Sequence, residues 1–346
     1  MRHIILDAMG GDNAPKAPVL GSIEAAKEFG LEIILVGQSD QILKCLEEEG
    51  IDTLPSGVEI AFASQVVTME SNPTTILHAY KDSSMVVGAK LLGNGGDAFV
   101  SAGSTGALLT AATLVAKRIK GIRRAALCPV CPTEKGSCVI VDAGATNECT
   151  PEYLLQFAYM GSFYAEKYLG IAHPRIGLLN NGAEETKGRD LQKETYALLK
   201  EAHTTGNLNF VGNVEARDVT LGGADVVVCD GFTGNILLKS IEGTAIFMSH
   251  QLKAMFQKNL GSKIGYLLCK SGVNDIKKLL DSREVGGSMF LGIQKPVVKA
   301  HGSSDAYAMK NAIRQAKICV ESGVCEAIAG SVDQMTVRKK TGNDQV

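Results

Sequence analysis

The fold class follows from one segment, Ala224-Asp-Val-Val-Val-Cys-Asp-Gly-Phe-Thr-Gly-Asn-Ile-Leu-Leu-Lys239. Residues 226–229 form a short β-branched run, which is typical of a strand buried on both faces of a parallel sheet. Asp230 and Gly231 end this strand, and Ile236 begins a helical pattern. In open α/β sheets, ligands bind over such turns at the carboxyl ends of the strands. The segment therefore predicts an α/β protein with a ligand site near residues 230–235.

The residues of this turn are suited to a ligand. Gly231 and Gly234 let the backbone approach closely, and the helix N-terminus offers free N–H groups to an anion. Asp230, Thr233 and Asn235 add polar side chains, and Asn235 is an uncharged donor and acceptor. A plain helix cap explains the same residues equally well, so both interpretations stay open.

Length and charge restrict the class of protein. The chain has 346 residues, a hydrophobic content of 45% and a net charge of −2. At roughly 150 residues per domain the length predicts two domains or subdomains. The near-zero charge argues against a nucleic-acid partner, which would need a basic face. Windows of ~18 apolar residues are missing, and residues 1–6 run straight into a strand, so neither a membrane span nor a signal peptide is expected.

The cysteines favour reduced thiols and a cytoplasmic location, since nine of them are spread over a long, core-rich chain. Cys128 and Cys131 have the spacing of a redox or half-zinc motif, but a second ligand pair at a suitable spacing is missing. We therefore expect neither a metal nor a cofactor.

Two further strand-to-helix turns are candidate anion sites. Strand 2–7 runs into a loop with Asp7, Gly10 and Gly11, which indicates either a ligand loop or a βα turn with a capping Asp. Strand 98–101 is followed by Ser104, Thr105 and Gly106, where two hydroxyls and a helix N-terminus favour binding of phosphate or carboxylate.

Other polar residues also follow predicted strands. The candidates are Asn147 after strand 138–141, Lys187 after strand 175–179, and His301, Ser303 and Ser304 after strand 296–300. Lys81, Ser83 and Ser84 lie in the segment 76–85, which is expected to enter a helix, and they could face an anion. For Lys81 and Lys187, a solvated charge is the alternative.

These repeated units predict a three-layer α/β fold, with a mostly parallel sheet, helices on both faces, and ligand loops gathered at the carboxyl ends of strands. Residues 1–335 are expected to form a single catalytic unit of two fused subdomains. Residues 336–346 are polar and are expected to be a disordered tail.

Residues 249–282 have apolar side chains at spacings of three and four, interleaved with lysines. Gly261, Gly265 and Gly272 suggest breaks, so we expect a protruding amphipathic helical pair. A homodimer contact is the first interpretation of its apolar face. An acidic carrier protein or a membrane surface is the alternative partner.

Six blocks, taken together, resemble the bacterial phosphate acyltransferases of phospholipid synthesis. They are residues 7–12, 81–85, 101–107, 213–218, 230–235 and 299–304. The resemblance spans residues 2 to about 325. It implies the fold of isocitrate and isopropylmalate dehydrogenases and of phosphate acetyltransferases. It also implies transfer of an acyl group from acyl-ACP to inorganic phosphate, with a glycerol-3-phosphate acyltransferase acting downstream. Ser104, where the family usually has Asn, and Thr146, inserted before Asn147, depart from the family pattern.

The implied chemistry fits the residue types. Phosphate is already an anionic nucleophile, so a Ser-His-Asp triad is not needed. Lys187 is expected to hold phosphate charge and Asn235 to donate to the thioester oxygen. His301 either assists a proton transfer or orders its loop. The alternatives are a metal- and NAD-dependent decarboxylating dehydrogenase of the same fold, which would need carboxylates and an Arg cluster, and a non-enzymatic scaffold for a carrier protein at the membrane.

Overall fold

The computed structural model describes residues 3–336, so the predicted tail lies outside the described residues except for Thr336. Eleven strands form one sheet. In spatial order they are β3 (Val58–Phe62), β2 (Glu32–Gly37), β1 (His3–Asp7), β4 (Ala98–Ser101), β11 (Val297–Ala300), β10 (Gly287–Leu291), β5 (Ala126–Thr133), β6 (Gly136–Val141), β9 (Val226–Val228), β7 (Arg175–Leu179) and β8 (Asn209–Val214).

The sheet is mostly parallel, as predicted. Only the pairs β11–β10, β10–β5 and β5–β6 are antiparallel among the described strands. Three reversals leave β6, β9, β7 and β8 running opposite to β1, β2, β3, β4 and β11. β5 itself was not predicted, because Pro129 and Pro132 interrupt its pattern.

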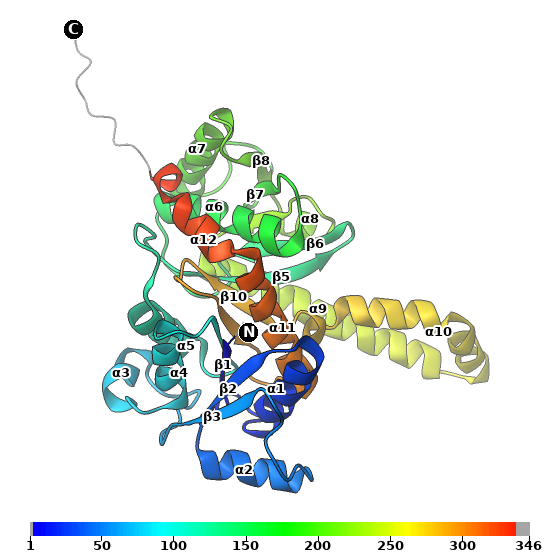
Figure 1. The fold of residues 1–346 in the computed structure, drawn as a ribbon. Coiled ribbons are helices and arrows are strands. Elements are labelled where there is room, and N and C mark those ends of the chain that lie inside the picture. Colours follow the sequence, from blue (N-terminus) through cyan, green and yellow to red (C-terminus); the bar gives the residue numbers. More distant parts are fainter. Residues whose placement is uncertain (1–2, 337–346) are drawn as a thin grey trace.

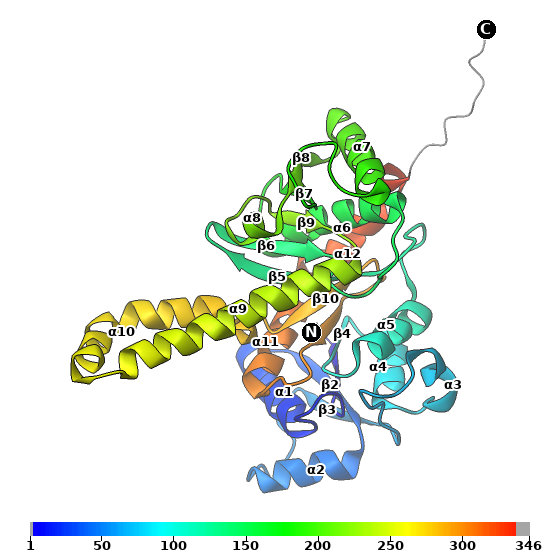
Figure 2. The ribbon, with the colours of Figure 1, turned by 180° about the vertical axis from the view of Figure 1, so that it is seen from behind.

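Helices cover both faces (Figures 1 and 2). They are α1 (Lys16–Phe29), α2 (Ser39–Glu48), α3 (Ile76–Ala79), α4 (Ser84–Gly93), α5 (Thr105–Ala111), α6 (Pro151–Leu169), α7 (Asp190–Thr204), α8 (Ala216–Thr220), α9 (Gly231–Gln257), α10 (Leu260–Leu280), α11 (Ala306–Ser322) and α12 (Val324–Gly330), with short turns η1 (Pro73–Thr75), η2 (Ala112–Lys117), η3 (Ser282–Glu284) and η4 (Val332–Met335).

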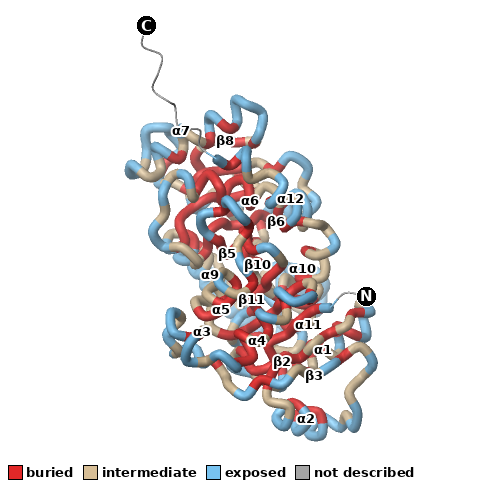
Figure 3. The backbone as a smooth tube through the Cα atoms, turned by 60° about the vertical axis from the view of Figure 1, so that its left-hand side comes forward, coloured by how far each residue is buried: buried red, intermediate tan, exposed pale blue. Residues whose placement is uncertain are grey.

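The core lies between the sheet and these helices, and buried residues follow the strands (Figure 3). One face packs against α1, α2 and α11 at the β1 end and against α6, α7 and α12 at the β7 end. The other face packs against α4 and α5 at the β1 end and against the start of α9 at the β9 end. The α/β class and the layered arrangement are therefore confirmed.

Helices α9 and α10 run side by side and project from the body (Figures 1 and 2). Phe256 and Tyr266 join them edge-on, with ring centroids 5.4 Å apart. The chain turns at Lys258 and Asn259, and Gly261, Gly265 and Gly272 lie inside α10 rather than breaking it. None of the described residues of α10 is buried. No helix within residues 3–336 is long and apolar enough to span a bilayer.

Candidate functional site

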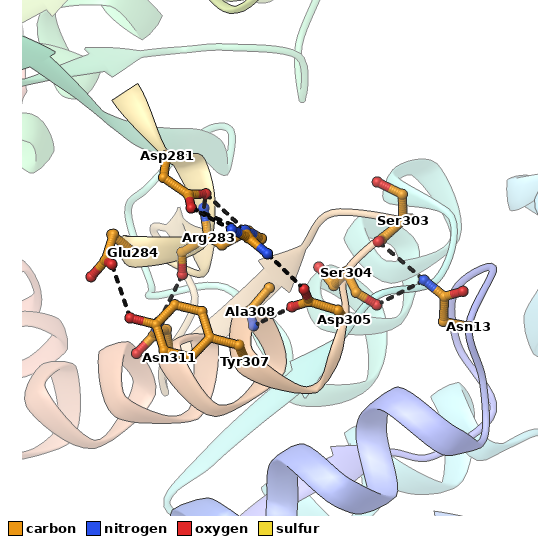
Figure 4. A network of polar contacts seen from close by, with 10 residues as sticks. All are labelled: Asn13, Asp281, Arg283, Glu284, Ser303, Ser304, Asp305, Tyr307, Ala308 and Asn311. Atoms are coloured by element: carbon orange, nitrogen blue, oxygen red, sulfur yellow. Dashed lines mark hydrogen bonds and ion pairs between the residues drawn. The ribbon is translucent and has the colours of Figure 1, made fainter. Parts of the chain in front are cut away.

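Three of the predicted loops meet at one edge of the sheet. Strands β1, β4 and β11 are parallel neighbours, so the loops that follow them leave the same edge. The backbone N–H of Asp12 donates to the carbonyl oxygen of Gly302 at 2.8 Å. The amide of Asn13 donates to the carbonyl oxygens of Ser303 and Ser304, both at 3.1 Å (Figure 4). The loops at 7–13 and 299–304 are thus tied together.

A polar row crosses these three strands. Lys299 is paired in register with Ser101, and the hydroxyl of Ser101 donates to Asp7 at 2.7 Å. Asp7 is buried and also accepts the N–H of Met9 at 3.1 Å. Burial raises the pKa of Asp7, and its hydrogen bonds oppose this rise. Asp7 therefore lies at the floor of the loops and orders them.

The glycines of the first loop are required by close packing. A Cβ on Gly10 would lie 2.6 Å from a carboxylate oxygen of Asp7. Gly11 has a φ of +97°, and its Cβ would lie 2.9 Å from the carbonyl oxygen of Gly302. Only glycine fits both positions, whether or not a ligand approaches them.

Lys81, Ser83 and Ser84 are placed differently from one another. Ser83 is buried and caps α4 by accepting the N–H of Val86 at 3.3 Å. Ser84 is buried beside Asp7, whose pKa it lowers by hydrogen bonding. Lys81 is exposed, and its carbonyl oxygen accepts from Lys90 at 3.1 Å. The two serines have structural contacts, and Lys81 lies at the surface.

The segment 104–106 begins α5 beside these loops. Ser104 takes the N-cap position, and Thr105 and Gly106 form the first turn; all three are half-buried. A Cβ on Gly106 would lie 2.8 Å from Pro73 Cγ, so this glycine lets η1 pack against α5.

Lys299 was not among the predicted site residues, although it lies in one of the quoted blocks. Its side chain is 8% exposed, and its ammonium donates to the carbonyl oxygens of Ala102 and Ala300. Burial, followed by the charge of Lys239, lowers the pKa of Lys299 to about 8. The signal in the sequence is a lysine directly after Val297 and Val298, in a strand otherwise buried.

His301 lies next to this lysine in the loop. Its Nδ1 is 2.9 Å from the Ser303 hydroxyl and accepts the N–H of Ser303 at 3.3 Å. Burial, followed by the charge of Lys239, lowers the pKa of His301 below its usual 6.5, which favours the neutral imidazole. These contacts hold the imidazole against the loop that carries Ser303.

A second group of turns follows β6 and β9. The Asp142 carboxylate accepts backbone N–H groups of Leu127, Gly144, Ala145 and Thr146 at 2.6 to 3.1 Å. Burial raises the pKa of Asp142 to about 6 against these bonds. The carbonyl oxygen of the inserted Thr146 accepts the N–H of Gly231 at 2.8 Å, which ties the two turns together. Asn147 follows and is exposed.

The 230–235 turn caps helix α9, and it holds the amide side chain of Asn235 in place. Asp230 caps α9 by accepting the N–H and hydroxyl of Thr233 at 2.9 and 2.7 Å. A Cβ on Gly234 would lie 1.9 Å from the carbonyl oxygen of Asp142. The exposed Asn235 donates to the carbonyl oxygen of Ala143 at 3.3 Å. Its second N–H is available to a ligand.

Lys187 lies in the loop after β7, the other neighbour of β9. Its side chain is half-exposed, 4.0 Å from Glu184. The amide of Asn180 donates to the Lys187 carbonyl oxygen at 3.2 Å, and the amide of Asn213 donates to that of Glu184 at 2.8 Å. Lys187, Asn147 and Asn235 thus follow three neighbouring parallel strands.

The strands of the two groups run in opposite directions, because three antiparallel pairs separate them. The loops 7–13, 101–106 and 299–304 follow parallel neighbours, whereas the 230–235 turn follows a strand of the opposite direction. Helix α9 connects the groups, since it begins at that turn and its Lys239 acts electrostatically on Lys299 and His301. Figure 2 shows α9 crossing the body.

Two other features lie apart from these groups. A cavity of about 390 Å³ is lined by Tyr159, Phe163, His173, His203 and Asn207, near the amino ends of β7 and β8. Within residues 3–336, no three His, Cys, Asp or Glu side chains are grouped to hold a metal ion.

Comparison with known proteins identifies the family. The model of the fatty acid synthesis protein family matches residues 2–327. The chain is 47% identical over 332 residues to a phosphate acyltransferase of Thermoanaerobacterium thermosaccharolyticum, covering 96% of this chain and 97% of the relative. It is 48% identical over 333 residues to a phosphate acyltransferase of Alkaliphilus oremlandii, covering 96% and 98%.

Among solved structures, a phosphotransacetylase from Streptococcus pyogenes is similar with a TM-score of 0.58 at 17% identity, covering 92% of this chain and 94% of that one. That likeness concerns the fold, and it agrees with the fold implied by the sequence blocks. The near-complete match to the family model and the close relatives establish the rest. The chain belongs to the phosphate acyltransferases, and is an acyltransferase of fatty acid and phospholipid synthesis.

Proposed function

We propose that the protein transfers a fatty acyl group from the thioester of an acyl carrier protein to inorganic phosphate. The product is an acyl phosphate for glycerophospholipid synthesis, where a glycerol-3-phosphate acyltransferase would use it. The observation that carries the proposal is the Asn235 amide, which is exposed at the start of α9 and fixed by Ala143. It can donate to the thioester oxygen without being charged itself.

The residue roles follow from the reaction. A phosphate oxygen attacks the carbonyl carbon, the C–O bond forms, and the carbonyl oxygen becomes an oxyanion. Collapse of this intermediate breaks the C–S bond and releases the carrier as a thiolate, which water protonates. Asn235 would stabilise the oxyanion, a contact that contributes about 3 to 4 kcal/mol in comparable sites. Lys187, from the neighbouring loop, would neutralise phosphate charge during the attack.

The projecting helices would provide the macromolecular contacts. Leu267 and Leu268 are 68% and 82% exposed on α10. Exposed leucines on a projecting element need a partner surface. Two copies of the chain could cover them isologously in a homodimer. The lysines beside them would face an anionic membrane or the acidic carrier, which would place the enzyme in the cytoplasm at the membrane periphery.

Phosphate dependence tests the reaction directly. The purified chain is incubated with acyl-ACP in the presence and absence of inorganic phosphate. The thioester is measured, together with acyl phosphate trapped as a hydroxamate. We expect thioester loss only with phosphate, matched by an equal amount of acyl phosphate. Binding of acyl-ACP without phosphate-dependent loss would instead support the carrier scaffold.

A further inference from the structure

We propose that two lysines outside the predicted site, Lys239 on α9 and Lys299 on β11, bind the phosphate nucleophile in the ground state. The inference rests on the proposed reaction and adds a binding site to it. Lys187 would then act on the phosphate during the attack, whereas this pair would hold it beforehand.

Lys299 is a buried cation with neutral partners. Its ammonium donates to two carbonyl oxygens, those of Ala102 and Ala300. Within residues 3–336, no carboxylate lies within the 4.0 Å of an ion pair with Lys299. Asp7 and Asp12 act on it electrostatically from farther away. A buried charge is costly unless an opposite charge neutralises it, so this position suits a bound anion.

Lys239 supplies a second cation on the same side of the sheet. Along β11, Val298 and Ala300 face the layer of α1 and α11, so Lys299 points to the opposite face, where α4 and α5 pack at the β1 end and α9 packs at the β9 end. The charge of Lys239 lowers the pKa values of both Lys299 and His301. Lys239 is half-exposed and paired with Glu242 at 2.7 Å, a contact that an anion can replace.

The loop beside the lysines holds an unused hydrogen-bonding group. Ser304 is 6% exposed, and its hydroxyl has no hydrogen-bond partner within the described part of the chain. Its carbonyl oxygen is fixed by Asn13, as Figure 4 shows. A buried hydroxyl without a partner is unusual in a folded protein, and phosphate oxygens would accept from such a group.

The pair is also within reach of the acyl group. Asn235 and Lys239 lie four residues apart on α9, so they share a face and are about 6 Å apart along the axis. A phosphate between Lys239 and Lys299 would therefore lie close to a thioester held by Asn235.

The ligand chemistry is a phosphate group, which has two sources in this reaction. Inorganic phosphate carries up to two negative charges near neutral pH. The phosphodiester of the carrier's phosphopantetheine arm carries one. Two converging cations match the dianion better, so we assign the site to inorganic phosphate.

Single and double variants Lys239→Met and Lys299→Met test the site, with Lys193→Met as the matched control. Lys193 is an exposed lysine near the start of α7, in the part of the chain between β7 and β8 rather than beside β4 or β11. KM values for phosphate and for acyl-ACP are measured, and binding of inorganic phosphate is followed separately by ³¹P NMR line broadening. We expect each single variant to raise the KM for phosphate ~10-fold or more, with the KM for acyl-ACP nearly unchanged. The control should match the parent, and Lys299→Arg should retain part of the affinity.

The outcomes separate the two proposals. If both variants keep the parent's phosphate KM and line broadening, the lysine site is overturned. If the KM for acyl-ACP rises instead, the lysines bind the carrier's phosphodiester, and the assignment is also overturned. If the parent broadens the phosphate line and the variants do not, but acyl-ACP is not consumed, the lysine site stands and the proposed reaction fails. If Lys299→Met fails to fold, Lys239→Met still tests the site, because it should raise the KM for phosphate by itself.

Discussion

Replacing Lys299 by methionine should make the protein more stable while impairing it as an enzyme. The pKa of Lys299 falls from its ordinary 10.5 to about 8, first through burial and then through Lys239. At about 1.4 kcal/mol for each pKa unit, the buried charge costs the folded state about 3 kcal/mol at neutral pH. Methionine fills a similar volume without charge, but Ala102 and Ala300 each lose a donor, at about 0.5 to 1 kcal/mol apiece. The free energy of unfolding should therefore rise by about 1 to 2 kcal/mol at pH 7.

The difference in the free energy of unfolding between Lys299→Met and the parent should depend on pH. Below pH 8 the lysine is protonated in both the folded and the unfolded chain, so the full cost is present. Between pH 8 and 10.5 the unfolded chain binds more protons than the folded one, so the stability of the parent rises with pH. Lys299→Met lacks this rise. The advantage of the variant should therefore shrink as the pH approaches 10.

Urea unfolding at pH 7, 8, 9 and 10 measures the effect, with Lys193→Met as the control. Added phosphate should stabilise the parent and not Lys299→Met, because a ligand stabilises only a state that binds it. A variant less stable than the parent at pH 7 would refute the reasoning, and so would a stability difference that stays constant from pH 7 to 10. Either result would mean that Lys299 does not carry a costly buried charge.

Three further predictions concern the turn and the helical pair. Asn235→Ala and Lys187→Ala should each lower turnover at least ~100-fold, as for loss of a transition-state contact; folded variants with near-native rates in a steady-state assay would rule out these roles. Gly234→Ala should cost about 2 kcal/mol or more in urea unfolding, because its Cβ has no room against the end of β6. Gly243→Ala on the same helix meets open space and should be neutral or stabilise by up to about 1 kcal/mol; equal effects of the two would contradict the packing. Leu268→Glu should weaken liposome binding and leave a dimer intact in sedimentation; unchanged liposome binding would argue against membrane contact, and a monomeric parent would argue against the dimer.

The sequence predicted the parts of the fold that depend on local pattern. Strand–glycine–helix units such as 98–109 and 224–239 have both a strand and its exit within a few residues, so their periodicity and turn chemistry are visible. β5 was hidden because two prolines normally exclude a residue run from a sheet interior. Without β5, the number of antiparallel reversals could not be known. The opposite directions of the strands that precede the two groups of turns could therefore not be predicted.

The surroundings of single side chains were harder to predict, because they also depend on residues that are distant in sequence. Lys299 donates to Ala102 and is affected electrostatically by Lys239, two residues distant in sequence that only the folded chain brings near. The Cys128 and Cys131 pair shows the converse. These residues face opposite sides of β5, in separate cores, and Cys131 lies across from Cys138 in the next strand. Spacing along a chain indicates a shared site only when the local structure brings the residues to one face.

Helix α9 also has a mechanical consequence. It is one continuous helix of 27 residues, about 40 Å long, from the Asn235 turn to the outer end of the projecting pair. Such a rod is stiff, so its two ends tilt together. The return helix α10 is anchored at its base, where Arg283 binds Asp281 and Asp305 (Figure 4). The helix pivots at the base of the pair. A surface that binds the outer half of α9 would therefore also change the orientation of the Asn235 amide at its start.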